Sequence, residues 1–199
     1  MKAFLSDSIS CLVLLFLAEF IALSLSRPAH SPALCALFGS MAPQVERLLH
    51  LSKKLHDLEL NLIAAADHRL DGLPRIPHTA AAFNTMKMNE SISQLYNFTE
   101  VFRSHMDWLK TARENVSLPN QAAEGASRHL LQLAHLLNST LHQVGAEVPQ
   151  PSPLSLPVAS SAFDALKFSV EISENLKAFS LWTKRSIRFL QRQSRCPRR

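Results

Sequence analysis

Metal binding and nucleophilic catalysis need clustered polar side chains, and the nine histidines of this 199-residue chain are not spaced for either. The sequence has no His-Glu-x-x-His run, and His129, His135 and His142 follow one another at steps of six and seven residues. The four glycines are isolated, so no glycine-rich loop can cradle a phosphate and no Gly-x-Ser-x-Gly turn can present a nucleophile. We therefore expect no catalytic residue, no metal, no cofactor and no enzymatic activity.

The N-terminal stretch has the features of a secretory signal peptide. Lys2 precedes an apolar run from Cys11 to Leu25, and a small residue, Ser26, follows it. The run carries Glu19 and is shorter than the roughly 20 apolar residues that a membrane span needs. We expect residues 1–26 to be removed, leaving a secreted, extracellular chain without a membrane span.

The remaining residues, 27–199, are enough for one domain, because 47% of the whole chain is apolar and one packed core would use up this length. Removal of residues 1–26 takes away Lys2, Asp7 and Glu19, which raises the formal net charge from +5 to +6. The mature chain is therefore moderately basic.

Cys35 and Cys196 are the two cysteines that remain when Cys11 leaves with the signal peptide. In an oxidising compartment we expect them to form a disulfide with each other rather than to react or to bind a metal. Such a bridge would close nearly the whole mature chain. A loop of that size stabilises a fold by about 5 kcal/mol in the chain-entropy treatment.

Four sequons, each with a hydroxyl residue at the third position and no intervening proline, support secretion. A three-residue pattern arises by chance, so each sequon alone is weak support. Together with the signal peptide they predict a glycoprotein whose modified asparagines are exposed. The predicted N-glycosylation sites are Asn89, Asn97, Asn115 and Asn138.

The C-terminal segment carries a run of basic residues with no acid between them. Three explanations stay open: a solvated face that complements the negative end of a helix dipole, a surface that docks a receptor, and a site for glycosaminoglycans. Nucleic acid is not an expected partner of a secreted chain. The run consists of Lys184, Arg185, Arg188, Arg192, Arg195, Arg198 and Arg199.

Four long segments with apolar residues at helical spacing predict an all-α fold. They run over about 40–66, 85–113, 120–145 and 161–193, and we expect every glycine and proline to lie at or beyond their ends. Ser40, Asn120 and Ser161 are the predicted N-caps, and Asp164 suits the positive end of the last helix.

Each segment has an apolar stripe that is expected to face a common core. In the first segment the stripe is Met41, Leu48, Leu51, Leu55, Leu58, Leu62 and Ala65, and in the second it is Ile92, Leu95, Phe98, Phe102, Met106 and Leu109. The third has Ala123, Leu130, Ala134, Leu137, Leu141 and Val144. The fourth has Ala165, Ile172, Leu176, Phe179, Ile187 and Leu190, beside a second stripe of Phe168, Trp182 and Phe189.

The lengths of the three connections predict the topology. Only the link over about 114–119 is short, which forces the second and third helices to be antiparallel, while the links over 67–84 and 147–160 are long enough to run back along the bundle. The result is an up-up-down-down, long-chain four-helix bundle with two long crossover loops. In that topology Cys35 and Cys196 lie at the same end.

Three local patterns resemble the interleukin-11 family, within the interleukin-6 group of long-chain cytokines. The run from Asp67 to Pro74, DHRLDGLP, resembles the family's DH-x-LD-x-LP, and His105 to Leu109, HMDWL, resembles its H-x-x-WL. Ser160-Ser161-Ala162-Phe163, with Trp182 and Arg185 further on, is similar to the family's SSAW, later Trp and Arg, with Phe163 in place of the first Trp. The cysteine pair and the sequons depart from mammalian members, which implies a divergent, non-mammalian vertebrate member.

The resemblance implies a cytokine or growth factor that is monomeric when free. It would bind an interleukin-11 alpha receptor, then recruit two copies of the signal-transducing receptor shared by the interleukin-6 family, and so trigger JAK-STAT signalling and cell proliferation or differentiation. Glycosaminoglycans are a further possible partner of the basic helix end.

The resemblance also suggests three groups of binding residues, here named by their positions in this chain. Trp182 and Arg185 match the alpha-receptor site, to which we add Lys184, Arg188 and Phe189 from the same helix end. Phe163 matches the aromatic that engages the second copy of the shared receptor, with Leu70 and Pro74 expected nearby. For the first copy, helical position alone suggests Arg47, Lys54 and Arg128.

A secreted lipid- or membrane-binding protein of amphipathic helices would share the signal peptide, the basic helix and the lack of catalytic motifs. Its apolar faces would open onto lipid. The narrow stripes of the first three helices and the cysteine pair that ties the chain ends favour the bundle instead.

Overall fold

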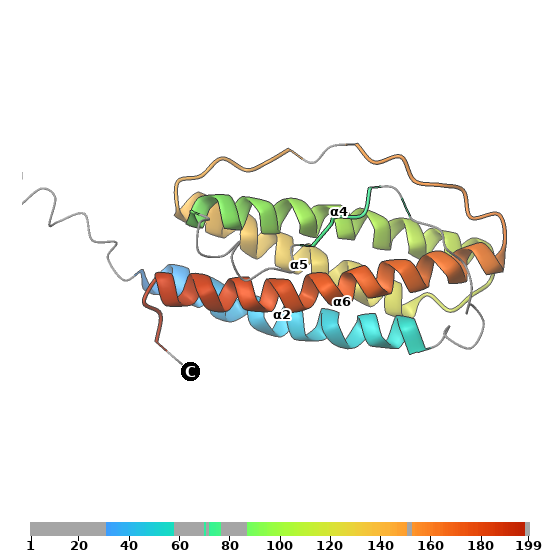
Figure 1. The fold of residues 1–199 in the computed structure, drawn as a ribbon, viewed down its shortest axis with the longest axis horizontal. Helices are drawn as coiled ribbons and strands as arrows, with labels where there is room; N and C mark the ends of the chain where they lie inside the picture. Colours follow the sequence, from blue (N-terminus) through green and yellow to red (C-terminus); the bar gives the residue numbers. More distant parts are fainter. Residues whose placement is uncertain (1–30, 58–69, 71, 77–86, 151–152, 198–199) are drawn as a thin grey trace, which may run out of the picture. The chain divides into compact units, whose positions relative to one another are not determined.

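The computed structural model describes residues 31–57, 70, 72–76, 87–150 and 153–197. The predicted signal peptide, residues 1–26, lies entirely outside these residues. In the unit Pro32–Arg199 the elements are α2 (Pro32–Asp57), α4 (Met88–Asn115), α5 (Gln121–Gln143) and α6 (Ala162–Gln193), as Figure 1 shows. The described residues contain no strand, and the predicted all-α class is confirmed.

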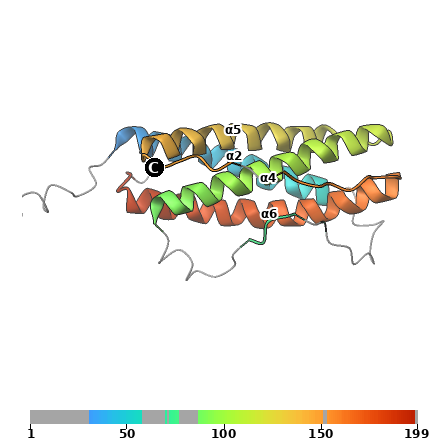
Figure 2. The same cartoon turned by 90° about the horizontal axis from the view of Figure 1, so that it is seen from above.

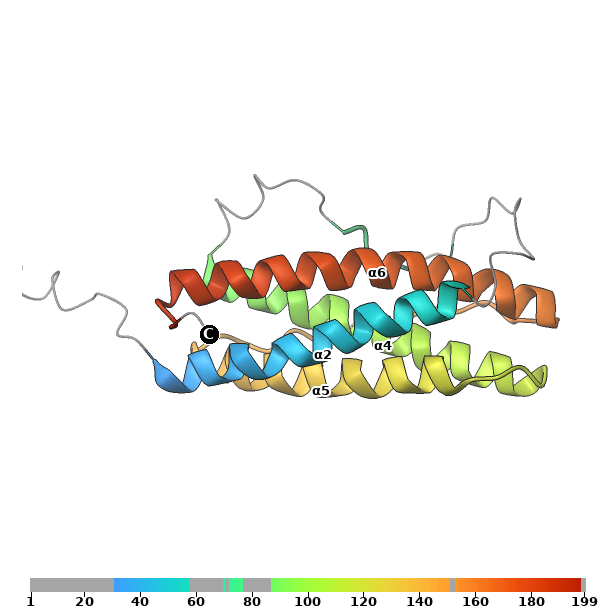
Figure 3. The same ribbon diagram turned by 90° about the horizontal axis from the view of Figure 1, so that it is seen from below.

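The four helices form an up-up-down-down bundle (Figures 1 and 3). α2 and α4 each pack on both α5 and α6, so α2 and α4 lie on a diagonal of the bundle. α2 and α6 are antiparallel. Glu46 of α2 pairs with Lys184 of α6, while His56, later in α2, meets Ser173, which is earlier in α6. The predicted topology is confirmed.

The predicted stripes form the core in the described residues, and most of their side chains are fully buried. The aromatic rings of Phe102 on α4 and Phe179 on α6 stack with their centroids 4.8 Å apart. Leu51, Phe98 and Val144 are only half-buried and pack against the edge of the core. The predicted stripe members Leu58, Leu62 and Ala65 lie outside the described residues.

The predicted start of the first helix is wrong, because α2 begins at Pro32 and contains Ser40. The Ser40 hydroxyl does not cap a helix end but donates to the Ala36 carbonyl oxygen at 3.0 Å. Proline suits a first helical position, where its missing N–H would have no intrahelical partner. Two further core residues, Leu34 and Phe38, lie in this early part of α2.

Gly39, Pro43 and Gly125 lie inside helices, contrary to the expectation that every glycine and proline would mark an end. A proline in a helix interior costs about 3 kcal/mol and a glycine about 1 kcal/mol. Gly39 and Pro43 are exposed, so water can reach the carbonyl group that loses its partner. The buried stripe on the opposite side of α2 outweighs the cost.

Two predicted caps have different outcomes. Asn120 precedes α5, but its side chain donates to the Glu114 carboxylate instead of capping the helix. The Ser161 cap is confirmed: the Asp164 amide donates to Ser161 Oγ at 3.1 Å, and this hydroxyl donates to Asp164 Oδ2 at 2.9 Å. The first turn of α6 is therefore fixed by its own sequence.

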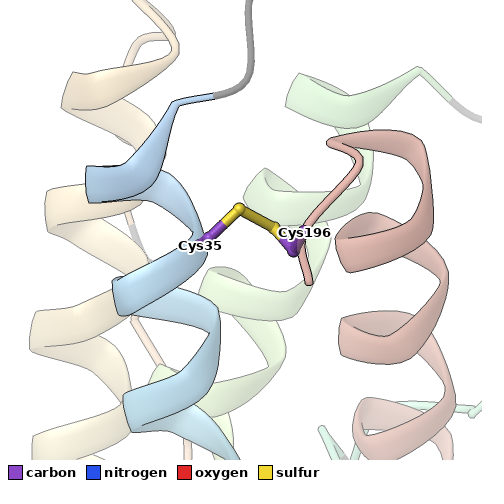
Figure 4. Close-up of a disulfide and its surroundings, with 2 residues drawn as sticks. All are labelled: Cys35 and Cys196. Carbon is purple, nitrogen blue, oxygen red and sulfur yellow. A yellow bond between two sulfur atoms is a disulfide. The ribbon is translucent and has the colours of Figure 1, made fainter. Parts of the chain in front are cut away.

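A disulfide joins Cys35, in the first turn of α2, to Cys196, just beyond α6 (Figure 4). The two residues are separated by 161 positions in the chain, and their Cα atoms lie 5.4 Å apart. The chain turns towards Cys35 at Arg195, whose φ of 53° is left-handed, and the Cys196 amide donates to the Gln191 carbonyl oxygen at 2.8 Å. The structure contains the predicted pairing.

Candidate receptor-binding surfaces

The C-terminal half of α6 carries an exposed cationic surface. Arg185, Arg188, Arg192 and Arg195, here called the basic ridge, are all exposed, and none forms an ion pair within the described part of the chain. The first three follow one another at three and four residues, which places them on one side of the helix. No acid follows Glu174 in the sequence, so the ridge presents positive charge alone.

Lys184 and Phe189 lie at the edges of this ridge. Lys184 Nζ forms an ion pair with the Glu46 carboxylate of α2, which holds the α6 surface against α2. Phe189 is half-buried and leaves part of its ring at the surface. These two residues could contact a partner only along the borders of the arginine cluster.

Trp182 differs from the other residues predicted for this site, because only 3% of its surface is exposed. Its ring centroid lies 5.6 Å from that of Phe98 on α4 and 6.4 Å from that of Phe179. In this conformation the Trp182 side chain is not at the surface, and its assignment to the alpha-receptor site stays a prediction. The indole packs under the ridge and supports it from within the core.

The opposite end of α6 presents an exposed aromatic. Phe163, in the first turn of the helix, is 54% exposed, and Val158, just before the helix, is 85% exposed. Both are large apolar side chains near the same end of α6, and together they offer an apolar surface that a partner could bury. Val158 was not found from the sequence, since an isolated valine in a connection gives no periodic signal.

The two residues predicted to lie beside Phe163 are less exposed. Leu70 is buried, and its backbone N–H donates to Glu171 Oε1 at 2.6 Å. Glu171 is eight residues beyond Phe163, or about 12 Å along the helix axis. Pro74 is half-buried. The Leu70 side chain belongs to the core, and its membership of the shared-receptor site stays a prediction.

The connection before α6 is tied to α4 near this end. Trp108 Nε1 donates to the Pro157 carbonyl oxygen at 3.0 Å, and the Trp108 ring meets Phe168 of α6 with centroids 5.3 Å apart. Further back along the connection, Leu154 lies against Gly72, where a Cβ atom would come within 3.0 Å of it. These contacts fix the segment that presents Val158.

A third surface lies where α2 packs on α5. Arg47, Lys54 and Arg128 are all exposed, and Lys54 is seven residues, or two turns, beyond Arg47 on the same side of α2. His129 Nδ1 lies 2.8 Å from Gln44 Oε1 across the interface. This contact brings Arg47 and Arg128 to the same region.

Burial lowers the pKa of His129 from its ordinary value of 6.5, and the positive charges of Arg47 and Arg128 lower it further, while a hydrogen bond with Gln132 opposes them. Arg128 also pairs with Glu124 at 3.0 Å. The sequence suggested the two arginines but not the half-buried histidine between them.

A family model described as Interleukin 11 matches residues 28–195 of the chain. That range covers all four helices and Cys35, and it ends one residue before Cys196. The chain belongs to the interleukin-11 family. A search of curated proteins gave no match. Because this family consists of cytokines and not of enzymes, the surfaces described above are those of an interleukin-11 cytokine fold.

Two of the four sequon asparagines of this interleukin-11 family member are exposed, Asn89 and Asn115. Asn97 and Asn138 are half-buried, so the expectation that all four are exposed is wrong for them. Both lie inside a helix, and the third residue of each of their sequons is a fully buried threonine. A sequon identifies a tripeptide, but it does not indicate whether the asparagine lies on the exposed or the buried side of a helix.

Two negative findings apply only to the residues that the structure of this interleukin-11 family member describes. Among them, no group of three or more histidine, cysteine or acidic side chains could hold a metal ion. No helix there is both long enough and apolar enough to cross a membrane.

Proposed function

We propose that this chain is a secreted cytokine that binds an interleukin-11 alpha receptor and assembles the signal-transducing receptor shared by the interleukin-6 family. Receptor assembly would trigger JAK-STAT signalling and cell proliferation or differentiation. The observation that carries the proposal is the placement of an exposed cationic ridge and an exposed aromatic at opposite ends of α6, in a chain of the interleukin-11 family.

The separation of the two surfaces supports simultaneous binding of two receptors. Phe163 and Arg185 are 22 residues apart on a continuous helix, which corresponds to about 33 Å. A standard interface covers about 800 Å² on each partner, or roughly 30 Å across if it is circular. Two receptors of ordinary size could therefore occupy α6 without overlapping.

The alpha receptor is assigned to the basic ridge in this proposal. Arg185 and Arg188 would meet acidic groups of the receptor, with Lys184 and Phe189 at the border and Trp182 as a buried support. Positive charge without internal partners accelerates the approach of an acidic surface and makes the association rate depend on salt. Bidentate pairing of arginine with carboxylates would supply the specificity.

The shared receptor is assigned to the two other surfaces. Its second copy would bury Phe163 and Val158, with Pro74 at the margin and Leu70 holding the loop from within. Its first copy would bind the surface that Arg47, Lys54 and Arg128 form along α2 and α5. The assignment to two copies comes from the family resemblance, and the exposure of both surfaces is what supports it here.

The test is binding of the purified mature protein to immobilised alpha-receptor ectodomain. An Arg185→Glu variant should lose at least tenfold in affinity, because it reverses a charge in the part of the ridge assigned to the receptor. Lys110→Glu makes the same charge change on α4 and should bind like the parent protein. Absence of binding by the parent protein would reject the alpha-receptor assignment, and equal losses in both variants would reject the ridge as its site.

Glycosaminoglycan binding is a second candidate for the same ridge, favoured by the exposure of Arg192 and Arg195 beyond the central arginines. Clustered cations bind a sulfated polysaccharide largely through release of its counterions, so the affinity falls steeply with salt. Elution from immobilised heparin should shift to lower salt in an Arg192→Gln, Arg195→Gln double variant. An unchanged elution position would remove this candidate.

The lipid-binding alternative has little support from the described surface. Its large exposed apolar side chains are Leu131, Val158, Phe163 and Leu181, which lie on three different segments. An interfacial helix needs a continuous apolar face, and the continuous faces of these helices are buried against one another. Flotation with anionic liposomes is the direct test, and we expect the protein to stay in the soluble fraction.

A further inference from the structure

The four sequons are unevenly distributed over the bundle. Asn89, Asn97 and Asn115 lie on α4 and Asn138 lies on α5, whereas α2, α6 and the described connections contain none. α4 is the helix diagonal to α2. It also carries none of the residues assigned above to a receptor. Three of the four sequons therefore lie on a helix to which the proposed function assigns no residue.

Helical geometry sharpens this placement on α4. Asn97 and Asn115 are eighteen residues apart, or five turns, and therefore lie on the same side of the helix. Between them, the buried stripe of Phe102, Met106 and Leu109 faces the core from the other side. Figure 2 shows α4 in front of the other helices, with the connection before α6 crossing over it. Side chains at these two positions consequently point away from the core.

Asn138 of α5 belongs to the same side. The Ser127 hydroxyl on α5 donates to the Asp107 carboxylate of α4, which marks the edge of α5 that faces α4. Asn138 is eleven residues beyond Ser127, or about three turns, and so lies on that same edge. On α4, Asn89 is eighteen residues, or five turns, before Asp107 and so lies on the edge that faces α5. All four sequons thus border a single surface, made by α4 and the adjoining edge of α5.

We propose that N-linked glycans cover this α4 surface, with Asn89 and Asn115 as occupied sites, and leave the surfaces of α2 and α6 bare for receptors. The occupied sites are the two whose side chains are exposed. A glycan is bulky and strongly solvated, so a protein–protein interface does not form beneath it. The part of the inference that leaves α2 and α6 bare for receptors rests on the proposed function. The part that concerns glycan occupancy does not, since occupancy can be measured without a receptor.

The modification itself is a transfer from a lipid-diphosphate-linked oligosaccharide in the secretory pathway. The asparagine Nδ2 forms a bond to the anomeric carbon of the first sugar and loses one proton. The bond between that carbon and the diphosphate oxygen breaks, and the lipid diphosphate leaves as the anion. The reaction involves no change of oxidation state.

Glycan occupancy is the first measurement. The full chain is expressed in eukaryotic secretory cells, and its peptides are analysed by mass spectrometry after enzymatic removal of glycans in heavy-oxygen water, which marks each formerly glycosylated asparagine. We expect high occupancy at Asn89 and Asn115. An unmodified asparagine at either position in most molecules would overturn the proposal.

Receptor binding is the second measurement, and added sequons provide a matched contrast. Asn89→Gln with Asn115→Gln removes the native glycans and should bind alpha receptor within about twofold of the parent. Arg192→Asn creates a sequon on α6, because Ser194 already stands at its third position. That variant should lose more than tenfold in affinity. The same change combined with Ser194→Ala keeps the loss of the arginine charge but abolishes the new sequon, so it should bind at least tenfold more tightly than the glycosylated variant. Equal affinities of the two variants would contradict the proposal.

The outcomes separate the two hypotheses. A gain of tenfold or more on removing the native glycans would show that they cover a docking surface, which overturns the proposal. If the parent protein binds no alpha receptor, the proposed function fails, while the occupancy result still decides where the glycans lie. Thermal unfolding of each secreted variant checks that loss of binding does not come from loss of the fold.

Discussion

The two ends of α6 are held in place by different means and present different chemistry. At its C-terminal end a disulfide and the Lys184–Glu46 ion pair tie the chain to α2, and the surface is cationic. At its N-terminal end the Ser161 cap and the Trp108–Pro157 hydrogen bond fix the chain, and the surface is apolar around Phe163. One helix can therefore offer two partners two kinds of contact.

The contrast suggests that the two ends of α6 affect different rates of receptor binding. Charge at the C-terminal end should act mainly on the rate of encounter and should weaken as salt screens it. Burial of an apolar ring at the N-terminal end should act mainly on the rate of dissociation and should respond little to salt. The predictions below test how far the two ends are independent.

The largest expected effect comes from removing the covalent tie. Replacing Cys35→Ser together with Cys196→Ser should lower the free energy of unfolding by up to about 5 kcal/mol, because the unfolded chain is no longer closed into a large loop. Thermal unfolding measures the loss. Hydrogen exchange should show reduced protection first in the last turns of α6, while the Ser161 end keeps its protection. Equal loosening at both ends would contradict the comparison.

Phe163→Ala should have the next largest effect, and it should fall on binding rather than on stability. Truncation of a central aromatic contact costs about 2 kcal/mol or more of binding energy, or about thirtyfold in affinity. Recruitment of the shared receptor to a preformed complex with the alpha receptor measures this loss. Alpha-receptor binding and thermal stability should both stay near the parent values, since the side chain is exposed and distant from the ridge. Loss of alpha-receptor binding would show that the ends are coupled.

The turn after α6 offers a smaller test of the C-terminal end. Two residues beyond α5 the chain turns at Gly145 with a φ of 67°, whereas two residues beyond α6 it turns at Arg195 with a φ of 53°. A left-handed conformation costs an ordinary residue about 1 kcal/mol, and glycine avoids this cost. Arg195→Gly should therefore raise the free energy of unfolding by up to about 1 kcal/mol, measured by denaturant unfolding with the disulfide intact. Gly145→Arg should have the opposite sign and serves as its control.

The α2–α5 interface should add a pH dependence that neither end of α6 supplies, with the smallest expected effect. The pKa of His129 is lowered in the folded state, so the unfolded chain binds more protons as the pH falls below the ordinary value of 6.5. The free energy of unfolding should therefore decrease between pH 7.5 and 5.5, and less so in His129→Gln. Parallel pH profiles for the two proteins would contradict a role for His129.

Much of the fold could be predicted because a helix with one buried face has apolar residues at a regular spacing in the sequence. The stripe from Ile92 to Leu109 predicted a buried face, and a serine three residues before an acid predicted the start of α6. The up-up-down-down topology places Cys35 and Cys196 at the same end of the bundle, and it therefore predicted their disulfide. Each of these predictions depended on local spacing or on topology alone, which explains why they succeeded.

Other features depended on neighbours that local rules do not include. Propensity favoured a helix start near Ser40, but burial of Leu34 and Phe38 extended α2 back to Pro32. Leu70 matched a family pattern in a loop, yet only its packing beside α6 decided that the side chain is buried. No sequence pattern pointed to Val158, because its position depends on the hydrogen bond that anchors the connection to Trp108.

The sequence by itself determined four helices, their apolar faces, the cap of α6 and the family, because these follow from residue type and spacing along one chain. Only the tertiary structure decided which of two aromatics on α6 meets solvent. Phe163 and Trp182 both matched family positions, but Phe163 lies beyond the reach of the neighbouring helices while Trp182 packs against Phe98 of α4. Exposure is set by what other segments cover, and no spacing within a single helix contains that information.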